Sequence, residues 1–108
     1  MKTKINSDDF IDFIEKLRPE VVIYALMMES KLQKNDHKGG WFNRSNGSLW
    51  HALHNEIREF DEALINRATA DVLPIFRESA DMSNYGMMIA DNLGALDEYY
   101  RLLLKKDK

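Results

Sequence analysis

The apolar residues in the first third of the chain recur with the spacing of an α-helix. One helical face, with i, i+3, i+4, i+7 spacing, is formed by Phe10, Phe13, Ile14 and Leu17. Ser7 can cap this helix. Pro19 ends it and can open a second helix over 19–34, because proline is tolerated in a first helical turn. The run VVIYALMM within the second helix is apolar on nearly every side, so we expect it to be buried.

A segment rich in glycine, asparagine and serine, 35–47, interrupts the helical pattern and predicts one long loop. A third helix is expected over about 48–67. Its core stripe is formed by Leu53, Ile57, Phe60 and Leu64. The turn ATAD follows, and its Asp71 can cap a fourth helix.

The fourth helix tolerates Pro74 in its first turn and should extend to about Asn92, where Gly94 provides a break. A last amphipathic helix carries apolar residues at Leu96, Tyr100, Leu103 and Leu104. These elements predict an all-α fold, a small bundle of about five helices. The length of 108 residues fits a single domain over 1–108.

The composition narrows the class of protein. A hydrophobic content of 44% with 31% charged residues is typical of a globular protein, and a net charge of −3 argues against nucleic acid as a partner. The absence of cysteine excludes disulfides and thiolate zinc sites. No apolar run approaches the roughly 20 residues of a membrane span, and the start MKTKINSDDF has no signal-like region. We therefore expect a cytoplasmic protein without a membrane partner.

Two pairs of acids interrupt the expected core stripes. Glu56 and Glu59 lie three apart on the third helix, and Glu78 and Asp81 lie three apart on the fourth, so each pair shares one helical face. The short turn between these helices makes them antiparallel neighbours. Because Glu56 and Asp81 are equally far from the turn, as are Glu59 and Glu78, the two pairs should face each other at matching heights.

Four carboxylates at this separation repel one another where water is scarce. Either their pKa values rise or a cation neutralises them, and ligands that are all oxygen favour a hard ion, Mg²⁺ or Mn²⁺. The alternative is that the acids are solvated and paired with Arg58, Arg77 or neighbouring lysines. The matching heights, and the apolar surroundings of the second pair in ADMSNYGMMIA, favour the metal site.

At these residues the chain resembles the MazG-like all-α nucleoside triphosphate pyrophosphohydrolases, in a phage and bacterial branch. Their motif is an EExxE helix followed by an ExxD helix. Here EIRE and ESAD match, with 18 residues between Glu59 and Glu78, and the segments KLQKNDHKGGW and ADMSNYGMMIADN extend the resemblance over about 28–92. One position departs from the pattern, because Asn55 stands where the first glutamate of the family often does.

The resemblance implies Mg²⁺-dependent hydrolysis of a (deoxy)nucleoside triphosphate to a monophosphate and pyrophosphate. It implies metal ligands at Glu56, Glu59, Glu78 and Asp81. One of the catalytic glutamates, Glu59 in preference to Glu56, would also orient the water or take its proton. Two alternatives stay open: a phosphoribosyl-ATP pyrophosphatase-like enzyme, and a catalytically silent helical interaction module with a structural divalent-metal site, which the Asn55 departure favours.

Four further residues are candidates for binding the substrate. Lys38 and the paired glycines of HKGGW suit phosphate, although an ordinary loop gives the same pattern. Trp41 can stack on a base or belong to the core. Asn84 and Tyr85 follow Asp81 on or beside its helical face. Asn84 can supply a neutral oxygen ligand or hold a phosphate, and Tyr85 can contact the sugar or the base, although satisfied polar groups of a packed helix give the same pattern. Lys31, Lys34 and Arg44 are possible phosphate contacts, although a solvated position is the simpler interpretation for each.

Three remaining features receive other interpretations. His51 and His54 are three apart, a spacing too weak to indicate zinc. Asp91 is expected to cap a helix end rather than join the acids. A chain this short with an apolar second helix is expected to bury that surface against another copy, as a homodimer or homotetramer.

Overall fold

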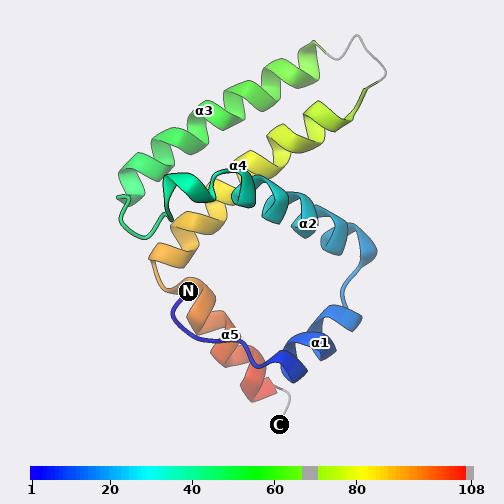
Figure 1. Ribbon diagram of the computed structural model, residues 1–108, viewed down its shortest axis with the longest axis vertical. Coiled ribbons are helices and arrows are strands. Elements are labelled where there is room, and N and C mark those ends of the chain that lie inside the picture. Colours follow the sequence, from blue (N-terminus) through cyan, green and yellow to red (C-terminus); the bar gives the residue numbers. More distant parts are fainter. Residues whose placement is uncertain (67–70, 107–108) are drawn as a thin grey trace.

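The computed structural model describes residues 1–66 and 71–106, and all regular structure in this part of the chain is helical. The all-α prediction with five α-helices is confirmed (Figure 1). A short 3₁₀ helix, η1, lies inside the expected loop. The elements in chain order are α1 (Ser7–Glu15), α2 (Pro19–Lys34), η1 (Asp36–Lys38), α3 (Asn46–Ile65), α4 (Leu73–Asn92) and α5 (Ala95–Lys106).

Helix α4 is the centre of the fold, because α2, α3 and α5 all pack against it. Figure 1 shows α3 and α4 side by side as an antiparallel pair, with α2 crossing α4 and with α1 and α5 together at the other end of the molecule. The α1–α5 contact depends on Tyr100, whose hydroxyl accepts a hydrogen bond from the Asn6 backbone N–H at 3.1 Å. The Phe13 ring meets the Tyr100 ring edge-on.

Two helix starts differ from the sequence expectations because a neighbouring residue makes the cap. Asn6, not Ser7, caps α1 and accepts the Asp8 N–H. Helix α3 begins at Asn46 rather than at Ser48, because the Ser45 side chain accepts the Ser48 N–H at 3.1 Å. Asparagine and serine both satisfy free N–H groups of a first turn, so a local sequence with several of them allows more than one start.

The other helix ends follow the sequence closely. Asp71 accepts the Leu73 N–H at 3.1 Å, although the capping position itself is Val72, and Pro74 lies in the first turn of α4. Helix α4 ends at Asn92, and Gly94 adopts a φ of 81°, a backbone conformation that other residues rarely take. The end of α3 expected near Arg67 and most of the expected turn lie outside the described residues.

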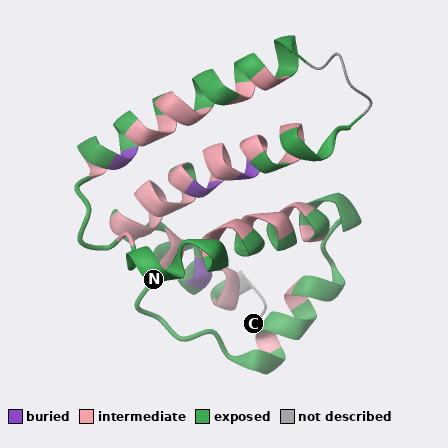
Figure 2. Cartoon of the chain, turned by 45° about the horizontal axis from the view of Figure 1, so that its top comes forward, coloured by how far each residue is buried: buried purple, intermediate pink, exposed green. Residues whose placement is uncertain are grey.

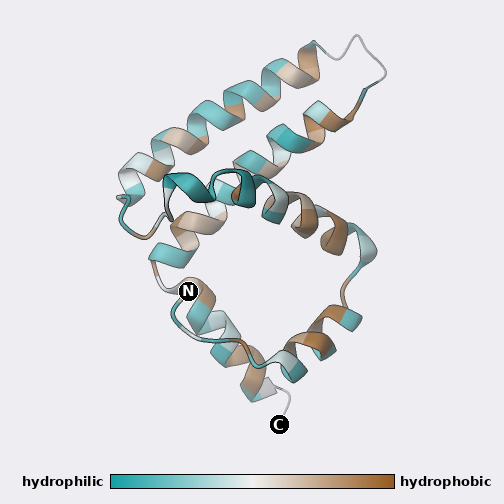
Figure 3. Cartoon of the chain, in the orientation of Figure 1, coloured by the Kyte–Doolittle hydropathy of each residue, from teal (hydrophilic) through white to brown (hydrophobic). Residues whose placement is uncertain are grey.

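The buried core of the single chain is small. Among the described residues only Leu49, Ala80, Asn84 and Tyr100 are buried (Figure 2). The prediction that 21–28 is buried is wrong for the single chain: Val21, Ile23 and Leu26 are 50–61% exposed. Only one face of α2 reaches α4, so the rest of its apolar surface stays uncovered. Figure 3 shows that the apolar residues of α2 are concentrated in its first half.

The apolar surface of these helices does not form a membrane-spanning segment in the described residues. Within 1–66 and 71–106, none of the helices combines the length and the hydropathy needed to cross a membrane.

Candidate metal centre and adjoining cavity

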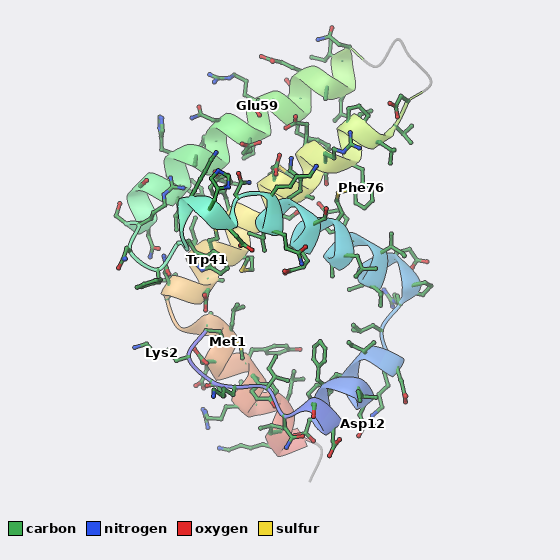
Figure 4. All side chains as sticks on the ribbon, viewed as in Figure 1. Met1, Lys2, Asp12, Trp41, Glu59 and Phe76 are labelled. Atoms are coloured by element: carbon green, nitrogen blue, oxygen red, sulfur yellow. The ribbon has the colours of Figure 1, made fainter. Side chains whose placement is uncertain are left out.

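The contact between α3 and α4 brings acids from the two helices together. Leu49 on α3 and Ala80 on α4 are fully buried. Because Ala80 directly precedes Asp81 and has only a methyl side chain, a neighbouring helix can approach α4 closely at this level. Glu56 and Glu59 project from α3, where Figure 4 labels Glu59, and Glu78 and Asp81 project from α4. We refer to these four residues as the acidic quartet.

Three members of the acidic quartet converge on one point. Glu56, Glu59 and Glu78 each present a carboxylate oxygen, and these oxygens all lie within 4.8 Å of one another. One oxygen of Glu56 and one of Glu78 are buried without a hydrogen-bond partner. Buried polar atoms are normally partnered, so these two oxygens lack a donor or a cation. Several carboxylate oxygens at this separation suit a hard divalent cation.

The pKa values of the two half-buried glutamates, Glu56 and Glu78, are raised because burial and neighbouring carboxylates disfavour their charged forms. Burial, then repulsion from Glu59 and Asp81, raises the pKa of Glu56 to about 7 from its ordinary value of 4.5. Burial and repulsion from the same two residues also raise the pKa of Glu78. The metal-free site therefore favours protonated carboxyls, as the sequence argument expected for crowded acids.

Asp81 is bound differently from the three glutamates. Its Oδ2 lies 3.3 Å from the Lys31 ammonium on α2, and both side chains are mostly shielded from solvent, at 23% and 22% exposed. Asp81 does not belong to the group of oxygens within 4.8 Å. It remains close enough for its charge to raise the pKa values of both half-buried glutamates. Its predicted role as a metal ligand stays a prediction.

An open cavity of about 460 Å³ adjoins the quartet and contains all four residues predicted to bind the substrate, Lys38, Trp41, Asn84 and Tyr85. Glu56 and Asp81 belong both to the quartet and to the wall of this cavity. The other residues of the wall come from α2, from the loop after it and from α4: Lys31, Leu32, Asn35, Asp36, Gly39, Gly40, Arg44 and Met88. The structure thus brings the sequence candidates together, and their individual roles stay predictions.

The C-terminal end of α4 holds the loop that carries Trp41. The Trp41 indole N–H donates to Asp91 at 2.9 Å, and the Asn92 side-chain amide donates to the Trp41 carbonyl at 3.2 Å. Asp91 also pairs with the Met1 ammonium. The expectation that Asp91 caps a helix end is therefore wrong, because its carboxylate bonds to Trp41 and Met1 instead. Figure 4 shows Trp41 beside this part of α4.

Asn84 and Tyr85 differ in their surroundings. Asn84 is only 4% exposed, and its amide donates to the Met28 carbonyl at 3.0 Å, while its side-chain oxygen is buried without a partner. That oxygen is an unused acceptor on a residue of the cavity wall. Tyr85 lies under the Arg44 guanidinium, 5.8 Å from the ring centroid, so its ring face is partly covered in this structure.

Two further sequence candidates have local partners. The Asn55 side-chain oxygen accepts a hydrogen bond from Arg58 at 3.3 Å, within the same helix. The His54 ring packs edge-on against Trp50, with centroids 4.5 Å apart. Neither His51 nor His54 belongs to a group of metal-ligating side chains among the described residues.

The helical periodicity of α4 and α2 indicates which faces carry Asp91 and Lys31, two residues whose surroundings differ from those expected from the sequence. Asp81, Asn84, Met88 and Asp91 recur along one face of α4, so this face continues from the quartet to the Trp41 loop. On α2, Tyr24, Met28 and Lys31 recur with i, i+4, i+7 spacing on the face that meets α4. Lys31, expected to be solvated, instead belongs to this interface.

Comparison of the chain with protein-family models, with curated proteins and with solved structures found no match. Any assignment of function therefore rests on the motifs of the sequence and on the geometry of the quartet and the cavity.

The raised pKa of Glu56 predicts how stability depends on pH without metal. Between its unfolded value of 4.5 and its folded value of about 7, the folded protein binds a proton more tightly than the unfolded chain. The free energy of unfolding should therefore fall as pH rises through 7. Because solvent screens a half-buried group, we expect the melting temperature to be about 4–8 °C higher at pH 5.5 than at pH 8, corresponding to roughly 1 kcal/mol.

Thermal melts in a chelating buffer measure this difference. Glu56→Gln should reduce the pH dependence, whereas Glu62→Gln, at an exposed position on the same helix, should keep it. A melting temperature that rises between pH 5.5 and pH 8 would show that ionisation of Glu56 does not destabilise the fold, contrary to this prediction.

Proposed function

We propose that this protein is a Mg²⁺-dependent nucleoside triphosphate pyrophosphohydrolase acting in the cytoplasm. It would cleave between the α and β phosphates and release a monophosphate and pyrophosphate. The observation that carries the proposal is the convergence of Glu56, Glu59 and Glu78 within 4.8 Å beside a cavity that also holds basic residues. The MazG-like EIRE and ESAD motifs contain the same acids.

The chain offers a suitable set of ligands for a divalent ion. Glu56, Glu59 and Glu78 would hold it, with Asp81 as a fourth ligand, because two of the glutamates have buried oxygens without partners. When bound, such an ion neutralises phosphate charge and lowers the pKa of a water in its coordination shell. Mn²⁺ has similar preferences and is expected to substitute.

The glutamates differ in how they can act on water. Glu59 is the exposed member of the three, so its carboxylate is open to solvent and can orient an attacking water. Glu56 lines the cavity and is the second candidate to accept the proton of that water. Both assignments require the α-phosphate to lie at the quartet, with the outer phosphates toward the basic side of the cavity.

The cavity has the size and the chemistry to hold a nucleotide. Its volume lies within the range of about 300–1,000 Å³ common for small-molecule sites. Lys38 supplies a positive charge for the outer phosphates, next to the backbone of Gly39 and Gly40. Trp41 offers an aromatic face for a base, and the unpartnered oxygen of Asn84 can accept a hydrogen bond from the sugar or the base.

A second copy of the chain is part of the proposal. The apolar residues of α2 that stay exposed in the single chain suit a homodimer or homotetramer, in which they would become buried. Helices α2 and α4 together line the cavity, so burial of the free face of α2 would also stabilise the site.

The identity of the products tests the function. With Mg²⁺ and a panel of ribo- and deoxynucleoside triphosphates and phosphoribosyl-ATP, we expect at least one substrate to yield monophosphate and pyrophosphate, read by ³¹P NMR. Diphosphate with inorganic phosphate would contradict the proposed bond cleavage. Metal binding without turnover of any substrate would favour the silent module with a structural metal site, the alternative that the asparagine at position 55 keeps open.

A further inference from the structure

Lys31 already supplies a cation to the acidic quartet. Its ammonium pairs with Asp81 at 3.3 Å across the contact between α2 and α4. Because more than three quarters of each side chain is shielded from solvent, this pair is less screened than a surface pair. The quartet thus has two parts: three glutamates that converge on one another, and an aspartate held by a lysine.

The packing of α2 on α4 fixes the position of Lys31. The Tyr24 hydroxyl bonds to the Ser79 and Ser83 hydroxyls, at 2.7 Å for Ser83. One turn further along α2, the Met28 carbonyl accepts the Asn84 amide at 3.0 Å. Lys31 is the next residue on the same face of α2, so its ammonium is directed to Asp81 by an anchored helix rather than by chance on a free surface.

A divalent ion at the glutamates would weaken the ion pair between Asp81 and Lys31. The ion would bring two positive charges close to Asp81, whose charge already acts on Glu56 and Glu78. The same charges would repel the Lys31 ammonium. A carboxylate between two cations favours the one with the higher charge and shorter contacts, and Lys31 then needs a new anionic partner. Lys31 lines the cavity, where the proposed function places the phosphates.

We propose that Lys31 competes with the divalent ion for Asp81: it holds Asp81 in the metal-free protein and moves to a phosphate oxygen when the ion takes its place. This inference rests on the proposed function, because it requires the metal centre and a bound polyphosphate. Lys31 would thereby couple the two binding events, since the phosphate gains the ammonium only after the metal has displaced it.

Binding of Mn²⁺ alone, measured by the EPR signal of the free ion in the absence of nucleotide, tests the competition. Lys31→Met keeps most of the length of the side chain and removes its charge. We expect this variant to bind Mn²⁺ about five-fold more tightly or better than the wild type, a change within the usual range of coupling between sites. Lys38→Met is the matched control, because Lys38 lines the same cavity and loses the same charge; it should change the affinity less than about two-fold.

Two outcomes of this experiment would overturn the inference while leaving the metal centre in place. The first is an unchanged Mn²⁺ affinity in Lys31→Met and in a second variant, Lys31→Gln, both checked for helicity by circular dichroism. The second is an equal gain in Mn²⁺ affinity in Lys38→Met, which would show that any nearby positive charge weakens Mn²⁺ binding by electrostatic repulsion, without competition for Asp81. If the wild type does not bind Mn²⁺, the inference and the proposed function both fail.

A separate measurement, the affinity for a polyphosphate in the presence of bound metal, tests whether Lys31 contacts phosphate. Inorganic tripolyphosphate serves as the probe, titrated calorimetrically in saturating Mn²⁺. Lys31→Met should weaken tripolyphosphate binding about five-fold or more, because a charge-assisted contact is lost, even though it binds the metal more tightly. Tripolyphosphate binding as tight as in the wild type would overturn the transfer.

Discussion

Glu59→Gln is expected to lower the rate of pyrophosphate release by roughly 100-fold or more at saturating Mg²⁺. Glu59 is the common neighbour of Glu56 and Glu78, so the substitution removes one ligand charge from the centre of the converging group. It also removes the carboxylate that we propose orients the attacking water. Asp81→Asn should lose activity as well, because the ion would lose the ligand that Lys31 releases.

The same substitution should leave the metal-free protein folded and more stable. Glutamine keeps the shape of glutamate and removes one of the charges that raise the pKa values of its neighbours. Glu62→Gln, one turn further along α3 at an exposed position, is the matched control and should keep both the activity and the stability of the wild type. Turnover by Glu59→Gln near the wild-type rate would contradict its assigned role.

The second large effect is stabilisation by the metal. Mg²⁺ or Mn²⁺ at about 100 times its dissociation constant should add roughly 2.7 kcal/mol to the free energy of unfolding, since the ion binds only the folded site. For a domain of this size, this corresponds to a rise of about 11–22 °C in melting temperature. The rise should be largest above pH 7, where Glu56 is ionised and repulsion within the quartet is greatest.

Sodium chloride at matched ionic strength is the control for this stabilisation, because simple screening also reduces repulsion among acids. Glu56→Gln should raise the melting temperature of the metal-free protein and lose most of the gain from Mg²⁺. Equal shifts by Mg²⁺ and sodium chloride would show a solvated acidic surface without a specific site, and the proposed enzyme activity would then lose its basis.

The helices and the meeting of the glutamates could be predicted because both depend on local periodicity. Residues three apart share a helical face wherever the helix starts, so shifting the start of α3 from Ser48 to Asn46 left Glu56 and Glu59 on one side. The antiparallel relation of α3 and α4 then indicated that acids of the two helices lie near each other, but it did not predict that Asp81 stays outside the converging group. The same periodicity placed Asn84 beside the cavity.

The features that were missed depend on how separate helices cross. The periodicity of α2 places Lys31 on one face with Tyr24 and Met28, but it does not indicate that Lys31 reaches Asp81, because that contact requires the angle and height at which α2 lies on α4. The bond from Trp41 to Asp91 likewise depends on the path of the loop after η1. The exposure of Val21, Ile23 and Leu26 was missed because an apolar run indicates burial without naming the partner that covers it.

Locating a bound ion is the most decisive test of a metal centre between α3 and α4. Crystals of the protein soaked in Mn²⁺, measured near the manganese absorption edge, would locate the ion by its anomalous scattering. We expect a peak between α3 and α4 within coordination distance of Glu56, Glu59 and Glu78, with Asp81 turned from Lys31 toward the ion. Well-diffracting soaked crystals with no peak at these carboxylates, or with Mn²⁺ bound only elsewhere, would contradict this expectation.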